Sequence, residues 1–108
     1  MGDRPNIVVV EDPFVRNFLR AALERHGHMV ICANHAQAIE LLRARSAHLL
    51  ITNTPAEFAE FGATVPLLYT AAFPDPAMAS SFTRWLPLPK PFQNDELLTS
   101  VRQLLGTL

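Results

Sequence analysis

The sequence is poor in several features that would assign it to a specialised class of protein. Its 108 residues contain one cysteine, so the chain can form no internal disulfide, which suits a reducing cytosol. A formal net charge of −1 provides no positive field for nucleic acid. No apolar run approaches the roughly 18 residues of a membrane span, and the polar segment at residues 1–6 does not have the form of a signal peptide. We therefore expect a cytoplasmic protein with no nucleic-acid or membrane partner.

The composition and the spacing of apolar residues indicate one α/β domain over residues 1–108. A hydrophobic fraction of 49% is enough for a real core. Strands are predicted at residues 7–10, 29–33, 49–52, 65–70 and 85–88, and helices are predicted after caps at Asp12, Asn34, Asp75 and Asn94. Aliphatic runs without polar alternation are typical of strands buried on both faces of a parallel sheet. The order predicts a flavodoxin-like, doubly wound sheet of five parallel strands.

The connection between the third and fourth strands is unusually short. It has only eleven residues, 54–64, whereas a parallel crossover needs about a dozen or more. We therefore predict that the third helix is shortened or missing. Phe58 and Phe61 fall in this connection and are expected to fold down over the sheet. Any sheet face left uncovered is expected to form an apolar patch, through which a dimer or a hetero-complex would assemble.

In the first predicted helix, Phe14, Phe18 and Ala22 form an apolar stripe with Leu19 and Leu23 beside it, which predicts the buried face. Several other apolar or titratable side chains are open to two interpretations. Four aromatic side chains belong either to the core or to an exposed contact patch: Phe58, Phe61, Phe73 and Trp85. Cys32 is expected to be a small core residue. The four histidines are interpreted as surface residues: His26, His28, His35 and His48.

Polar side chains follow four of the five predicted strands, where ligands bind in open parallel sheets. They are Glu11, Asp12, Asn53, Thr70 and Lys90. Adjacent carboxylates suit Mg²⁺, and a hydroxyl with an ammonium group suits phosphoryl oxygens. A simpler interpretation is also open: the acid pair would be a solvated turn and helix cap, Asn53 a turn former and Thr70 an ordinary strand residue.

Four short segments, in this order on five alternating strands, carry a family resemblance over nearly the whole chain. They are IVVVED at residues 7–12 with Arg16, LLITN at 49–53, PLLYTA at 66–71 and KPF at 90–92. The sequence resembles a response-regulator receiver domain, the CheY-like superfamily of bacterial two-component signalling. The resemblance implies that Glu11 and Asp12 would be Mg²⁺ ligands, that Thr70 and Lys90 would contact a phosphoryl group, and that position 53 would accept it from a histidine kinase.

The sequence departs from that family at two functional positions. Asn53 stands where the phosphoacceptor aspartate belongs, and a carboxamide is not a competent nucleophile for acyl phosphate formation. The loss of that negative charge predicts weak or lost Mg²⁺ binding. Pro87 stands where receivers usually carry the aromatic residue of their switch. The sequence therefore predicts a degenerate pseudo-receiver, a non-enzymatic module that binds a histidine kinase, another regulator, an output domain or a second copy without phosphorylation.

Two other functions are kept as alternatives. The first is a phosphorelay receiver that uses a displaced acceptor, Asp12 or Glu11. The second is a small flavodoxin-like binder of nucleotide or flavin, which would need a phosphate-cradling loop after the first strand. Residues 11–14 there contain two acids and no glycine, which disfavours that alternative.

Overall fold

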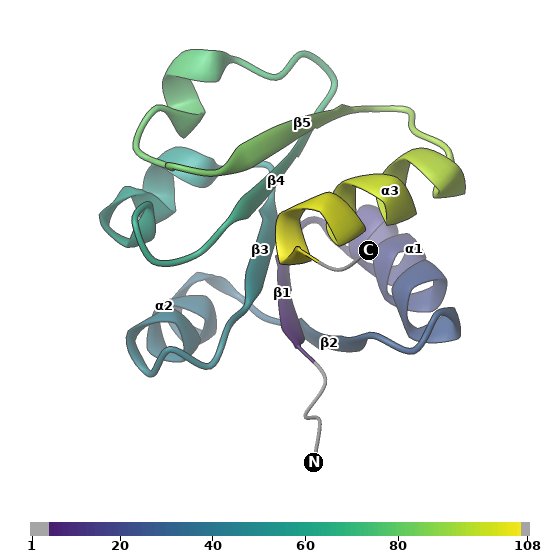
Figure 1. Cartoon of the computed structure of the whole chain (residues 1–108), viewed down its shortest axis with the longest axis horizontal. Helices are drawn as coiled ribbons and strands as arrows, with labels where there is room; N and C mark the ends of the chain where they lie inside the picture. The colour runs from purple at the N-terminus through teal and green to yellow at the C-terminus, as the bar shows by residue number, and fades with distance from the viewer. Residues whose placement is uncertain (1–4, 107–108) are drawn as a thin grey trace.

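A computed structural model describes residues 5–106, which fold around a single parallel sheet (Figure 1). The strands are β1 (Asn6–Val10), β2 (Met29–Cys32), β3 (Leu49–Thr52), β4 (Leu67–Ala71) and β5 (Trp85–Pro89), in the spatial order β2-β1-β3-β4-β5. The predicted doubly wound, five-stranded sheet is confirmed. Most of the polar N-terminal segment, residues 1–4, lies outside the described residues.

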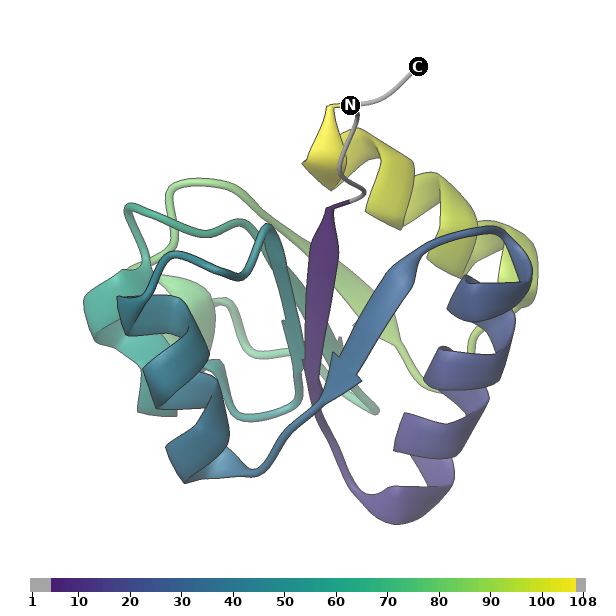
Figure 2. The same cartoon turned by 90° about the horizontal axis from the view of Figure 1, so that it is seen from below.

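Helical segments cover both faces of the sheet (Figure 2). On one face lie α1 (Pro13–Arg25) and α3 (Asn94–Leu105). On the other lie α2 (His35–Arg43) and two short 3-10 segments, η1 (Pro55–Phe61) and η2 (Pro76–Ala79). The predicted shortening of the third helix is confirmed, because η1 is what remains of it. Within residues 5–106, no helix is long and apolar enough to cross a bilayer.

The sheet face beside η1 is covered, as expected of Phe58 and Phe61, so the apolar patch expected of an uncovered face does not form. The rings of Phe58, Phe61 and Phe82 are buried together with the side chains of β3 and β4 on the η1 side. Large aromatic side chains fill the space that a regular helix would occupy, since a phenylalanine ring covers far more area than an aliphatic side chain.

The apolar stripe predicted on α1 is only half buried. Leu19, Ala22 and Leu23 are in the core, whereas Phe14 is 85% exposed and Phe18 is 42% exposed. Helical periodicity shows which residues share a stripe, but not which edge of a broad stripe meets the sheet. The two phenylalanines lie at the outer edge of that stripe.

Several local signals in the sequence have the predicted structural effect. Asp12 is the N-cap of α1 and accepts a hydrogen bond from the backbone N–H of Val15 (3.1 Å). Asn34 and Gln37 form both hydrogen bonds of a capping box at the start of α2. Gly27, like Gly106 after α3, has the positive φ that a helix C-terminus favours.

Other element boundaries differ from the prediction. The cap of α3 is Gln93 instead of Asn94, with Glu96 completing a capping box. Strand β4 begins at Leu67 because the Val65 amide bonds to the carbonyl of Phe61. The helix after Asp75 is a single 3-10 segment that ends before Phe82.

Strand β5 forms one edge of the sheet and contains two prolines. The amide of Lys90 donates to Ala71 of β4 (2.8 Å), so the backbone groups of alternate residues, Leu86 and Leu88, also face β4. Pro87 and Pro89 therefore occupy positions whose backbone faces away from the sheet, where a missing N–H breaks no ladder hydrogen bond. Pro87 is compatible with the strand for this reason.

Candidate functional site

The candidate site lies at the carboxyl edge of the sheet, where three strands bring distant residues together. Glu11 directly follows β1, Thr70 is the fourth residue of β4, and Lys90 directly follows β5. Parallel pairing aligns these strand ends, since Val10 is paired with Thr52 and Thr70 with Leu88. The sheet topology thus unites residues separated by 59 and 79 positions in the sequence.

The carboxylate of Glu11 is the centre of this cluster. The Nζ atom of Lys90 lies 3.3 Å from Oε1, and the Thr70 hydroxyl donates to Oε2. The Glu11 side chain has 0% exposure, that of Lys90 has 24%, and Thr70 is buried. A buried carboxylate is stable only when it is paired and hydrogen-bonded. Both Glu11 oxygens have partners, so this buried charge is satisfied within the chain.

The other two predicted site residues do not join this cluster. Asp12 is exposed, and its Oδ1 atom caps α1. Asn53 is exposed after β3, and within residues 5–106 its side chain makes no hydrogen bond or ion pair. On either side of Asn53, the hydroxyls of Thr52 and Thr54 lie within hydrogen-bond distance of each other (3.2 Å). The structure therefore brings together Glu11, Thr70 and Lys90, and it leaves Asp12 and Asn53 at the rim.

The resemblance to receivers implies a Mg²⁺ ion, and the residues present do not fit one well. Mg²⁺ needs carboxylate oxygens that are free to coordinate it in near-ideal octahedral geometry. Glu11 gives its two oxygens to Lys90 and Thr70, and Asp12 uses one oxygen as a helix cap. Among the described residues, no group of three or more His, Cys, Asp or Glu side chains could hold a metal.

The remaining candidate residues have structural surroundings. Cys32 is partly buried against the core, as predicted. Three histidines are exposed, as predicted, whereas His28 is half-buried between α1 and β2, which corrects its interpretation as a surface residue. Burial lowers the pKa of His28 below its ordinary value of 6.5, and the neighbouring His26 lowers it further.

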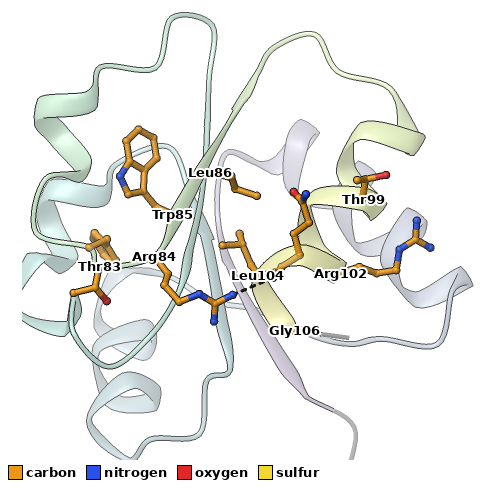
Figure 3. A pocket seen from close by; sticks show the side chains of 10 residues that line it. Thr83, Arg84, Trp85, Leu86, Thr99, Arg102, Leu104 and Gly106 are labelled. Carbon is orange, nitrogen blue, oxygen red and sulfur yellow. Dashed lines mark hydrogen bonds between the residues drawn. The ribbon is translucent and has the colours of Figure 1, made fainter. Parts of the chain in front are cut away.

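A groove also lies away from the polar edge of the sheet. It has a volume of about 800 Å³ and runs between β5 and α3, where a guanidinium nitrogen of Arg84 donates to the carbonyl of Gln103 at 3.0 Å (Figure 3). In Figure 3, Leu86 points toward α3, whereas the guanidinium of Arg102 points away from Arg84. No sequence motif marks these two arginines as members of a site. Because their charges do not converge, the groove forms no evident anion site.

Comparisons with known proteins agree with this architecture. No protein-family model matches the sequence, and no curated protein matches it. Solved structures do match. One is the signal receiver domain of an HD domain-containing protein from Pseudomonas fluorescens, with a TM-score of 0.79, 22% identity, and coverage of 98% of this chain and 90% of that one.

Two further structures show the same similarity. A response regulator receiver protein from Sinorhizobium medicae has a TM-score of 0.78 and 21% identity, and 96% of each chain is covered. Chemotaxis protein CheY4 from Vibrio cholerae has a TM-score of 0.76 and 18% identity, with coverage of 94% of this chain and 99% of that one. Residues 5–106 therefore have the fold of a response-regulator receiver domain, the CheY-like fold.

Proposed function

We propose that this chain is a pseudo-receiver, a signal-transduction module of two-component type that binds a protein partner without being phosphorylated. It acts in the cytoplasm, without catalysis and without a resident metal. Its partner is a histidine kinase, another regulator, an output domain or a second copy of the chain. The proposal combines the receiver fold with the chemistry of the residues at the carboxyl edge of the sheet.

The observation that carries the proposal is the state of Thr70 and Lys90. These are the two groups that would contact a phosphoryl group, and both already bind the carboxylate of Glu11. An incoming phosphoryl group would have to displace a buried, paired carboxylate, which costs several kcal/mol when the carboxylate is left without partners. Asn53 also lacks the carboxylate nucleophile that would hold the group covalently.

The alternative with a displaced acceptor has less support. The Glu11 side chain is fully buried, and both its oxygens are engaged. Asp12 is exposed, but one of its oxygens caps α1. A flavodoxin-like ligand site has less support still, because the loop after β1 presents two acids to any phosphate.

Intact mass spectrometry after incubation with acetyl phosphate and Mg²⁺ tests the proposal directly. We expect no phosphoryl adduct on the wild-type chain. Asn53→Asp, run beside it, measures whether restoring the nucleophile is sufficient. An adduct on the wild-type chain would overturn phosphate independence. If that adduct were lost in Asp12→Ser, which keeps a helix-capping side chain but removes the carboxylate, the acceptor would be Asp12.

A titration with inorganic phosphate tests the role of Glu11. We expect Glu11→Ala to release Thr70 and Lys90 and thereby to gain phosphate-dependent NMR shifts at both residues. The wild-type chain should show none at the same concentration. Circular dichroism would verify that the variant is folded. Equal responses in the two proteins would contradict the view that Glu11 occupies the phosphate position.

A further inference from the structure

The outer surface of α1 carries an apolar groove at the margin of the core. The groove has a volume of about 480 Å³ and is lined by Phe14, Val15, Phe18, Lys90, Pro91 and Phe92. Phe18 packs edge-on against Phe92, with ring centroids 5.7 Å apart, and the Phe14 ring is almost fully exposed. Adjacent exposed aromatic rings beside a groove mark an interaction surface.

The exposed stripe of α1 has a definite polarity along the helix. It runs through Phe14, Phe18, Ala21 and Arg25, spaced four, three and four residues apart. Its N-terminal half is therefore bulky and aromatic, with the exposed carboxylate of Asp12 at the end. Its C-terminal half is small and positively charged. Neither of the two ion pairs within residues 5–106 involves Arg25.

This polarity makes the stripe complementary to itself. When two copies of α1 pack antiparallel about a two-fold axis midway between positions 19 and 20, Phe14 of one copy faces Arg25 of the other, each about 8 Å from the axis. Phe18 then faces Ala21, so a large side chain meets a small one. In this arrangement, Arg25 of one copy would lie opposite Phe14 of the other and beside its Asp12, which would combine a cation–π contact with an ion pair.

We propose that the chain forms a homodimer through antiparallel packing of α1, centred on Phe18 and Ala21. The inference rests on the proposed function, because it names a second copy of the chain as the protein partner. It does not require phosphate, metal or a conformational change. It also assigns a role to the two phenylalanines that the core leaves exposed.

Sedimentation equilibrium over a range from micromolar to near-millimolar protein tests the dimer and its register. We expect a concentration-dependent monomer–dimer equilibrium for the wild-type chain. Phe14→Lys places like charges opposite each other, and Arg25→Glu places an acid opposite Asp12. Each variant should raise the dimer dissociation constant by at least about tenfold. Phe73→Lys, at a ring that is 91% exposed outside the groove lining, is the matched control and should leave the constant unchanged.

Combining Phe14→Lys with Arg25→Glu in one chain tests the antiparallel pairing. The two positions lie about 16 Å apart on the same helix, so they can interact only across the dimer. We expect the double variant to dimerise more tightly than either single variant. No recovery would overturn the proposed register, and a wild-type chain that stays monomeric throughout would overturn the dimer. Neither result shows whether the chain is phosphorylated. Intact mass spectrometry with acetyl phosphate tests that part of the proposed function separately.

Discussion

On one face of the sheet, two regular helices of 13 and 12 residues, α1 and α3, cover the strands. On the other face, the nine residues of α2 are followed by 3-10 segments of seven and four residues. Within residues 5–106, each face nevertheless has a cluster of twelve buried hydrophobic residues. Those of the helical face are all aliphatic. Those of the irregular face include the four rings of Phe58, Phe61, Tyr69 and Phe82.

The difference shows how a receiver-type sheet tolerates the loss of a helix. The regular helices α1 and α3 each bury three aliphatic side chains, whereas the shorter η1 buries one proline and two phenylalanine rings. Aromatic rings compensate because each buries roughly 150–250 Å². The irregular face therefore depends on a few large side chains and on close backbone approach between η1 and η2.

The largest expected effect is at Phe58, which has no exposed surface and supports the irregular face. Phe58→Ala should lower the free energy of unfolding by about 3–5 kcal/mol, because it removes a large buried ring and leaves a cavity. Urea denaturation measures the change. Glu60→Ala, at an exposed residue of the same segment, should change stability by less than about 0.5 kcal/mol. A loss below about 1 kcal/mol at Phe58 would show that the ring does not replace the helix.

The next effect is at Gly62, where η1 ends against the segment after η2. Its carbonyl accepts a hydrogen bond from the Thr83 amide (3.1 Å), and a Cβ atom there would collide with the carbonyl oxygen of Ser81. Gly62→Ala should cost about 2–3 kcal/mol through overpacking against backbone. Gly27→Ala on the helical face has open space around it and should cost only about 1 kcal/mol, from its positive φ. Thermal unfolding of both variants measures the two losses of stability. Equal losses would show that the backbone is packed no more closely at Gly62 than at Gly27.

The smallest effect concerns the helical face, where His28 lies between α1 and β2. Because its pKa is lowered in the folded chain, the unfolded chain binds the proton more readily as the pH falls below about 6.5. The stability of the fold should therefore decrease between pH 7.5 and pH 5.5, and the wild-type chain should lose more than His28→Asn. The midpoint of urea unfolding at the two pH values measures this. Identical losses in both proteins would assign the pH dependence to other groups.

The sequence allowed much of the scaffold to be predicted, because local signals determine it. The β-branched run before Glu11 forms β1, the Asn34 capping box starts α2, and the short connection after β3 leads to η1. The exposed phenylalanines of α1 were not predicted, because helical periodicity alone does not orient a stripe toward a sheet. Phe58 and Phe61 were predicted to cover the sheet on the η1 side. The sequence did not show that these rings, together with Phe82, would cover that face without leaving an apolar patch.

The candidate site was predictable as a set of residues but not as a set of contacts. Strand order places Glu11, Thr70 and Lys90 at one edge, and this placement could be inferred from the alternation of strands and helices. The sequence could not show that Glu11 binds both Thr70 and Lys90, because these contacts depend on how far each side chain extends across the strand ends. Asp12 and Asn53 belong to the same edge, yet helix capping and exposure separate them from the cluster.

The prolines of β5 affect how copies of this chain can assemble. An exposed sheet edge normally acts as a template on which further strands add, one after another, which is the geometry of fibrils. Pro87 and Pro89 remove two amide protons from the outer side of β5, so a strand arriving there would find carbonyl groups with few donors between them. Addition of a further strand along this edge is therefore disfavoured, because the outer side of β5 has carbonyl acceptors but few backbone donors.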